Sequence, residues 1–310
     1  EKTYKALEKQ QLLYEGSTKP PKGAKKDEWI EKKHILFKSK NFGDDEDRVV
    51  KKHDGQWTYF MPDIAYHLNK FERGFIKMIN IFGADHSGYI ARMKAAVKAV
   101  TNGEANLDIK TCQLVSLSRA GKPVKMSKRS GSFVTLKEIV DEVGKDAVRF
   151  MMVSRKNDAQ LDFDFEIFKN ENNDNPIFYI QYANARISSL LRNSKEKLGI
   201  NIKDEDLKNA DFTLLENENE KRIIFQIANF PKVIEQSAIF MEPHRLSYYL
   251  RDLASSFHQY WNLKIDSKRI HILDKSQIEL SIARLALLIV VSITIKSGLK
   301  LLGIEAIEEL

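Results

Sequence analysis

Apolar and polar residues follow two periodicities in the first part of the chain, and together these predict an α/β domain. Residues 77–82, in which Met78, Ile79, Ile81 and Phe82 are apolar, have the pattern of a buried strand closed by Gly83. The next segment carries apolar residues at spacings of three, four and three, on one face of a helix: Ile90, Met93, Val97 and Val100. Residues 112–117 predict a second strand. A strand, a helix and a strand within about forty residues predict a right-handed crossover and a parallel sheet.

The pattern changes beyond residue 171. Strand patterns disappear, and four long amphipathic segments follow, at residues 176–193, 213–241, 243–263 and 277–302. They predict a helical bundle. We therefore expect two domains, an α/β domain over residues 1–170 and an all-α domain over residues 171–310, which a length of 310 residues also favours.

The longest apolar run, residues 285–295, lies inside the last amphipathic segment. Its eleven residues are far fewer than the roughly 20 that span a bilayer, so we expect a buried helix and no membrane partner. The first twenty residues lack the apolar stretch of a secretory signal. Cys112 is the only cysteine, which excludes an intramolecular disulfide and a cysteine-based zinc site within the chain and fits a reducing cytoplasm.

Charge changes this picture at two places. The net charge of +7 is compatible with a polyanionic partner. The acidic cluster Asp44–Asp47 is expected to be a solvated turn; a metal site is the weaker alternative. By contrast, residues 110–137 carry seven positive side chains and no acid, which predicts a strong local positive potential.

The centre of that basic region, which we call the signature loop, reads Lys125-Met126-Ser127-Lys128-Arg129-Ser130-Gly131. Two lysines and two hydroxyls on a short segment ending in glycine are suited to holding phosphates, although a solvated basic loop would have the same composition. Thr135 and Glu138 follow at capping-box spacing, so a helix is expected to begin directly after the loop.

The signature loop resembles the Lys-Met-Ser-Lys-Ser motif of class I aminoacyl-tRNA synthetases. Five further segments occur in an order that closely resembles the bacterial arginyl-tRNA synthetase family, residues 43–49, 59–67, 83–89, 161–164 and 175–186. The resemblance covers nearly the whole chain after residue 40. It implies the second half of a Rossmann-like class I catalytic domain, followed by a helical-bundle anticodon-binding domain of the DALR type.

The resemblance also assigns roles to residues of the signature loop. Lys125 and Lys128 match the two lysines that stabilise the ATP phosphates as pyrophosphate leaves, and they are the implied catalytic residues. An ammonium is a compact charge that can follow a developing phosphate charge. Met126, Ser127 and Arg129 complete the implied ATP-binding loop.

For the amino acid substrate, Tyr59 and Asp63 match a tyrosine and an aspartate that contact arginine. A carboxylate suits a guanidinium because two parallel hydrogen bonds fit its planar fork. Without the resemblance, Asp63 would be interpreted as a helix N-cap after Pro62. Asp85 and His86 follow the end of the first predicted strand, where substrates bind in such sheets, and are also expected to contact arginine. Their individual roles stay open, and His86 alone would more often be structural.

In the helical domain, the spacing of Tyr179, Tyr182 and Arg186 places them on one helical face, where core packing is the usual reason for such a stripe. The resemblance makes them candidates for tRNA binding. Tyr260 and Trp261 are expected to be exposed and to stack on unpaired bases, with burial as the alternative.

The activity implied by the resemblance is arginine–tRNA ligation: ATP and arginine form arginyl-adenylate, and the arginyl group passes to the 2′-hydroxyl of the terminal adenosine of tRNA(Arg). ATP is then a substrate, Mg²⁺ accompanies it without an identified protein ligand, and we expect a cytoplasmic monomer. Cysteinyl-tRNA synthetases share the motif but need several cysteines to bind zinc. The single cysteine of this chain therefore argues strongly against that family.

The family's His-x-Gly-His motif and amino-terminal tRNA-binding domain do not occur in these 310 residues. We therefore expect a carboxyl-terminal fragment that does not charge tRNA by itself. The alternatives are a truncated, inactive paralogue and, from a different class of function, a non-catalytic RNA-binding module.

Overall fold

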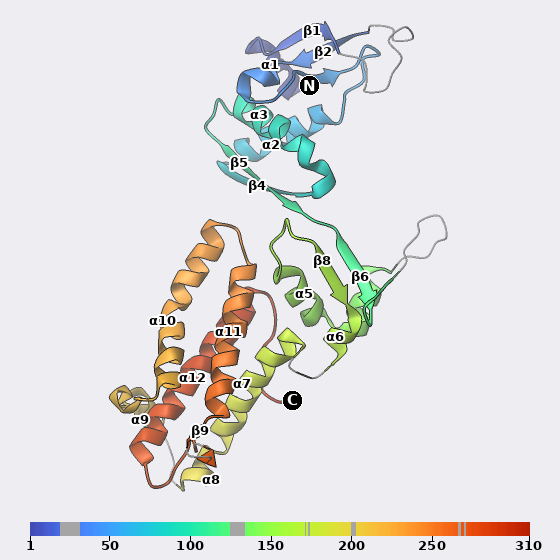
Figure 1. The fold of residues 1–310 in the computed structure, drawn as a ribbon. Coiled ribbons are helices and arrows are strands. Elements are labelled where there is room, and N and C mark those ends of the chain that lie inside the picture. The colour runs from blue at the N-terminus through green and yellow to red at the C-terminus, as the bar shows by residue number, and fades with distance from the viewer. Residues whose placement is uncertain are drawn as a thin grey trace. The chain divides into compact units, whose positions relative to one another are not determined.

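The computed structural model describes residues 1–18, 32–124, 134–170, 172, 174–199, 203–265, 268–269 and 271–310. Their contacts divide the chain into two compact units, residues Glu1–Leu114 and Val115–Leu310 (Figure 1). The first unit combines small sheets with helices, and the second is mainly helical, so the expected combination of α/β and all-α structure is confirmed. The domain boundary near residue 170 stays a prediction, because compactness and domain ancestry need not divide a chain at the same residue.

The first unit begins with helix α1 (Lys2–Lys9) and a three-stranded antiparallel sheet with the order β1 (Leu13–Ser17), β2 (Lys33–Phe37) and β3 (Arg48–Lys51). A short 3-10 helix, η2 (Ser39–Phe42), connects β2 to the segment before β3. Phe37 and Val50 are fully buried, and they join the core of this unit together with residues of the following helices. The sheet is therefore anchored to the helices by one apolar face.

The rest of the first unit is the expected crossover. Its elements are α2 (Phe60–Glu72), β4 (Lys77–Gly83), the 3-10 helix η3 (Ala84–Tyr89), α3 (Ile90–Val100) and β5 (Asn106–Cys112). Strands β4 and β5 pair in parallel, from Lys77 opposite Asn106 to Gly83 opposite Cys112. The predicted strand over residues 112–117 is only partly right: Cys112 ends β5, residues 113–114 connect two strands, and residues 115–117 begin the next strand, Val115–Arg119. The second strand of the crossover, β5, alternates apolar and polar residues and was not predicted from the sequence.

Alternation along β4 gives the sheet two different faces. Met78 is buried in the same core as Ile64 of α2 and Met93 of α3. Ile79 and Ile81 point to the opposite face and are 47% and 72% exposed. The carboxyl end of β4, and the polar residues that follow it, are therefore accessible.

The second unit starts with a three-stranded sheet in the order β7 (Lys122–Pro123), β6 (Val115–Arg119) and β8 (Leu161–Asp164), in which β6 and β8 are parallel. Helices then dominate: α4 (Leu136–Val143), α5 (Lys145–Val153), α6 (Phe165–Lys169), α7 (Pro176–Arg192), α8 (Ser194–Leu198), α9 (Asp204–Lys208), η4 (Phe212–Leu214), α10 (Glu218–Ile239), α11 (His244–Trp261) and α12 (Ile278–Leu301). A two-stranded ribbon, β9 (Lys264–Ile265) and β10 (Lys268–Arg269), follows α11.

The four long helices α7, α10, α11 and α12 lie side by side and confirm the predicted bundle (Figure 1). Helix α12 is long and apolar enough to span a membrane, but just over half of its most apolar stretch is buried within the protein. Leu288, Val291 and Ile295 are fully buried, as expected for a core helix. Gly298 allows α11 to approach, because a Cβ there would lie 2.6 Å from a methyl carbon of Leu250.

Candidate functional site

The signature loop falls within residues 125–133, outside the described residues, so the roles of Lys125, Lys128 and their neighbours stay predictions. The structure describes how the chain is held on the near side of the loop. The β6–β7 turn at Ala120 and Gly121 has positive φ at both residues, and both backbone N–H groups donate to the Asp164 carboxylate, at 3.1 and 2.7 Å. The bond from Gly121 in particular lowers the pKa of Asp164. This anchored hairpin fixes where the loop begins.

The far side of the loop is held by the predicted capping box, which is confirmed. The Thr135 hydroxyl accepts from the Glu138 N–H at 3.2 Å, and the Glu138 carboxylate accepts from the Thr135 N–H at 2.7 Å. Further along α4, Glu142 binds Arg119 of β6 and Lys169 of α6. Hydrogen bonds from these two cations lower the pKa of Glu142 to about 2. The described residues on both sides of the loop are therefore held in place by hydrogen bonds and ion pairs.

The predicted arginine-binding residues come together in the first unit. Tyr59, Asp63 and His86 line one cavity of about 730 Å³. Its other lining residues are aromatic, aliphatic or polar, with one cation, Lys70, whose ammonium lies over the Tyr66 ring: Tyr66, His67, Lys70, Ile79, Asn80, Ile81, Phe82, Tyr89 and Met93. Among the described lining residues Asp63 is the one carboxylate, and with the ring faces around it, it is suited to a planar cation, while the Lys70 ammonium is engaged by Asn80 and the Tyr66 ring.

Asp85 is the predicted residue that does not line this cavity. Its carboxylate is 81% exposed and lies 3.7 Å from His86 Nε2. The same carboxylate lies over Gly83 at the end of β4, where a Cβ would come within 2.5 Å of Asp85 Oδ1.

Asp63 does not cap helix α2. The N-cap position is occupied by Tyr59, and Asp63 lies within the first turn, so the alternative interpretation as an N-cap is wrong. Its Oδ2 atom instead accepts a hydrogen bond of 2.8 Å from the hydroxyl of Tyr89, which is 26 residues away in sequence. The Tyr59 side chain at the helix start is 94% exposed.

A chain of polar contacts lies behind Asp63 and was not predicted from the sequence. His67 is buried, and its Nδ1 lies 2.7 Å from the Asp63 carbonyl oxygen. The carbonyl can only accept, so Nδ1 carries the proton and Nε2 accepts from Asn80 Nδ2 at 2.9 Å. Lys70 then donates to Asn80 Oδ1 at 3.3 Å. This chain fixes the backbone of α2 at Asp63 against strand β4.

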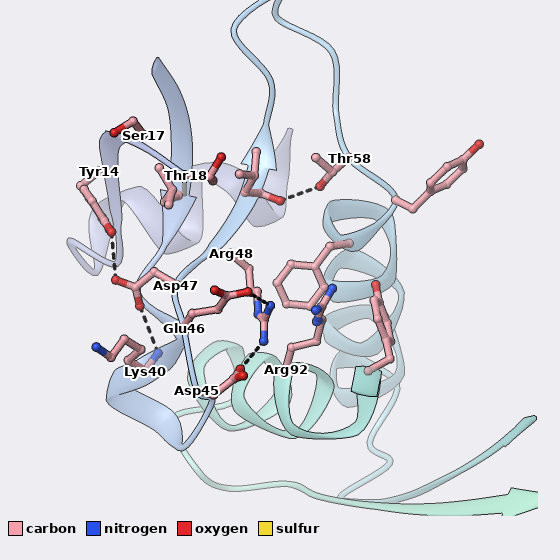
Figure 2. A pocket seen from close by; sticks show the side chains of 15 residues that line it. Tyr14, Ser17, Thr18, Lys40, Asp45, Glu46, Asp47, Arg48, Thr58 and Arg92 are labelled. Atoms are coloured by element: carbon pink, nitrogen blue, oxygen red, sulfur yellow. Dashed lines mark hydrogen bonds and ion pairs between the residues drawn. The ribbon is translucent and has the colours of Figure 1, made fainter. Parts of the chain in front are cut away.

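Figure 2 shows a second cavity, of about 960 Å³. It shares the lining residues Tyr59 and Tyr89 with the first cavity. Figure 2 shows Arg48 directed toward Asp45 and Glu46, while Asp47 accepts from the Tyr14 hydroxyl and the Lys40 N–H. Acidic and basic side chains therefore balance along this wall.

The acidic cluster Asp44–Asp47 is only partly the solvated turn that we predicted: Asp45 and Glu46 are exposed, but Asp44 is not. Asp44 is buried, and Arg48 donates to both of its carboxylate oxygens, at 2.8 and 2.9 Å. Burial would raise the pKa of Asp44, but the hydrogen bonds from Arg48 and Asp45 lower it to about 2. Asp44 and Arg48 therefore form a buried ion pair at the base of the cluster. Among the described residues, no group of three or more histidine, cysteine, aspartate or glutamate side chains is placed to hold a metal ion.

In the second unit, the predicted tRNA-binding residues of α7 lie on one face and meet α11. The Arg186 guanidinium lies 4.0 Å from the centre of the Tyr182 ring and 5.6 Å from that of Trp261. Its Nη1 lies 3.3 Å from His258 Nδ1, and His258 Nε2 donates to the Tyr179 carbonyl at 3.1 Å. Burial lowers the pKa of His258; its hydrogen bond to Tyr179 opposes the shift, and the charge of Arg186 adds to it. His258 is a member of this cluster that sequence reasoning missed.

The expectation that Tyr260 is exposed is wrong. Its ring is 1% exposed, and its hydroxyl donates to Glu220 Oε1 at 2.7 Å. Arg284 donates to the same oxygen at 2.8 Å, which gives this buried carboxylate a counter-charge. Trp261, the next residue, is half-buried and contacts Phe257. Only Trp261 of this pair is placed to reach a ligand.

Two family models match the chain. One described as the catalytic domain of class I (R) tRNA synthetases matches residues 29–193, and one described as a DALR anticodon binding domain matches residues 180–310. The chain is 53% identical, over its full length, to an arginine–tRNA ligase of Parvibaculum lavamentivorans, of which it covers 53%. It is 50% identical, over 96% of its length, to that of Beijerinckia indica, of which it covers 51%. The chain thus spans about half the length of the curated relatives that it matches.

Solved structures are similar over the whole chain. A protein described as an arginyl-tRNA synthetase from Campylobacter jejuni matches with a TM-score of 0.80 and 32% identity, covering 100% of this chain and 61% of that one. Arginyl-tRNA synthetase of Thermus thermophilus matches with a TM-score of 0.75 at 20% identity, covering 100% and 57%. The second likeness concerns the fold alone.

Proposed function

This chain belongs to the family of class I arginyl-tRNA synthetases, and on that premise we propose that it forms the arginine-binding and anticodon-binding part of an arginine–tRNA ligase. In the proposed reaction, a carboxylate oxygen of arginine attacks the α-phosphorus of ATP and pyrophosphate leaves. The 2′-hydroxyl of the terminal tRNA adenosine then attacks the carbonyl carbon of arginyl-adenylate. AMP leaves, and the hydroxyl proton is released.

The observation that supports arginine as the substrate is the position of Asp63. It is the one carboxylate among the lining residues of the 730 Å³ cavity, where Tyr59 and His86 also lie. A guanidinium placed against Asp63 would gain charge-assisted hydrogen bonds and contact with the aromatic rings that line the cavity. Neutral analogues such as citrulline offer no charge to this site.

Catalysis in this proposal consists of positioning and charge stabilisation, without a protein nucleophile. Lys125 and Lys128 would stabilise the phosphates as pyrophosphate leaves, and Met126, Ser127 and Arg129 would complete the ATP site. Their support is the sequence motif together with the anchored hairpin and the capped helix on either side of it. Mg²⁺ would arrive with ATP, bound through the phosphates rather than by a protein cage.

The helical unit would bind tRNA(Arg). Tyr182, Arg186 and Trp261 form a face of rings and one cation, a combination that suits stacking on unpaired bases and contact with phosphates. Tyr179 would act indirectly: its carbonyl oxygen accepts a hydrogen bond from His258, which lies beside Arg186. A cytoplasmic monomer that works with arginine, ATP and tRNA is the simplest assignment consistent with these sites.

Calorimetric titration of the chain with arginine tests this function. Asp63→Asn removes the countercharge and should weaken arginine binding by about 100-fold, equal to about 2.7 kcal/mol. The matched control is Asp54→Asn, an exposed turn carboxylate that lines neither cavity and should leave the affinity unchanged. If Asp63→Asn binds arginine normally, the assignment of the site fails. A chain that binds tRNA but no arginine would instead favour the non-catalytic RNA-binding module.

A further inference from the structure

We propose that Tyr89 is a positioning residue for arginine recognition: its hydroxyl holds one oxygen of Asp63, so that the other oxygen faces the cavity in a fixed direction. The inference rests on the proposed function, since it takes Asp63 as the acceptor of the substrate guanidinium. It adds a residue outside the set that the sequence motifs assigned.

The geometry that carries this inference is a single hydrogen bond between two elements. Tyr89 ends η3 and forms the N-cap of α3, whereas Asp63 lies in the first turn of α2. The Tyr89 hydroxyl lies 2.8 Å from Asp63 Oδ2. Within the described part of the chain, no other donor to the Asp63 carboxylate is found. Because the terminal torsion of an aspartate is soft, this bond alone sets the plane of the carboxylate.

Tyr89 is itself held tightly by its surroundings. Its ring meets the rings of Phe60 and Phe82 at centroid distances of 5.9 and 6.3 Å, both edge to face. The guanidinium of Arg92 lies 4.9 Å from the ring centre. Burial, followed by the bond to Asp63, raises the pKa of Tyr89, so the hydroxyl keeps its proton and remains a donor across the neutral range. The donor therefore sits on a rigid ring with a fixed protonation state.

Tyr89 also lies at the boundary between the two cavities. Its side chain lines both cavities, whereas Asp63 lines only the smaller one. With Oδ2 occupied on the Tyr89 side, the remaining lone pairs of the carboxylate, chiefly those of Oδ1, are left for a ligand in the smaller cavity. A guanidinium that donates to Oδ1 would thus find its acceptor already oriented, which reduces the ordering that binding requires.

The test is a double-mutant cycle in the 310-residue chain, with arginine as the calorimetric probe. Tyr89→Phe removes one oxygen and keeps the ring contacts. It should weaken arginine binding by about tenfold. If Tyr89 acts through Asp63, then Tyr89→Phe combined with Asp63→Asn should bind arginine no more weakly than Asp63→Asn alone. Independent, multiplicative losses would overturn the positioning role, because they would mean that Tyr89 contributes without Asp63.

Tyr14→Phe is the matched control. The Tyr14 hydroxyl also donates to an aspartate, Asp47, at 3.0 Å in the same unit, but it does not line the arginine cavity. Its removal should leave arginine affinity unchanged.

Unaltered binding by Tyr89→Phe, with Asp63→Asn defective, would refute the inference alone. An unaltered Asp63→Asn variant, or no arginine binding by the parent chain, would overturn the proposed function and this inference together. Melting curves of each variant report folding separately.

Discussion

Asp63 in the first unit and Arg186 in the second are both half-buried charged residues, yet they are held in opposite ways. The Asp63 carboxylate has one hydrogen bond, from Tyr89, and otherwise lines an open cavity. The Arg186 guanidinium lies against two rings and is hydrogen-bonded to Tyr182 and close to His258. A charge that is left partly unsatisfied is available to a ligand, whereas a charge satisfied by neighbours also stabilises the fold.

The comparison separates binding from stability. Removing the charge of Asp63 takes away a ligand contact and little packing. Removing Arg186 takes away packing of α7 against α11 together with any contact to tRNA. The two units therefore predict different signatures for the same kind of substitution: loss of ligand affinity at Asp63, and loss of stability together with affinity at Arg186.

Arg186→Ala should have the largest combined effect. We expect tRNA affinity to fall about tenfold and the free energy of unfolding to fall by about 1–2 kcal/mol, since a cation–π contact and hydrogen bonds to a charged group are lost. Filter binding and urea denaturation measure the two quantities. Asp63→Asn, in the same denaturation assay, should change stability by less than about 0.5 kcal/mol. Equal losses of stability in both variants would break the comparison.

Tyr260→Phe tests whether the helical unit separates its buried network from its ligand face. The substitution leaves Glu220 with Arg284 but without the tyrosine hydroxyl, so stability should fall by about 1 kcal/mol. Because Tyr260 is buried, tRNA affinity should stay at the parent value. A weakened tRNA complex with normal stability would mean that the ring is reached by RNA, against its position in the core.

Lowering the pH should produce the smallest effect, through His258. Burial lowers the pKa of His258 in the folded protein below its ordinary value of about 6.5. The unfolded chain therefore takes up a proton first, and stability should be complete above pH 6.5 and decline as the pH falls below it. Urea denaturation between pH 7.5 and 5.5 measures the decline. His244, whose pKa burial also lowers, contributes in the same direction.

His258→Gln should flatten this dependence while His244 supplies the remainder. His258 Nδ1 lies close to Arg186 Nη1, so the same variant removes one of the contacts that hold the arginine. It should alter tRNA binding at neutral pH, but less than Arg186→Ala does, because the arginine itself remains. If the pH dependence of stability is identical in the parent and in His258→Gln, then the burial of a neutral His258 beside Arg186 does not contribute to stability.

Several features of this protein could be predicted from the sequence because their causes are local. The spacing that placed Met93 and Val97 on one face predicted α3, and the capping box at Thr135 and Glu138 predicted the start of α4, since both depend on residues within one or two helical turns. The ordered motifs also indicated the family, and Tyr59, Asp63 and His86 do share a cavity.

Other features were decided only by tertiary structure. The sequence relates neither Tyr89 to Asp63 nor His258 to Arg186, because each contact joins side chains of different helices, whose directions depend on packing. Tyr260 and Trp261 were treated as one pair, but consecutive residues of a helix point about 100° apart, so one faces the core and its neighbour does not. Which of the two is buried follows from where the partner helices lie, and a single amphipathic segment does not contain that information.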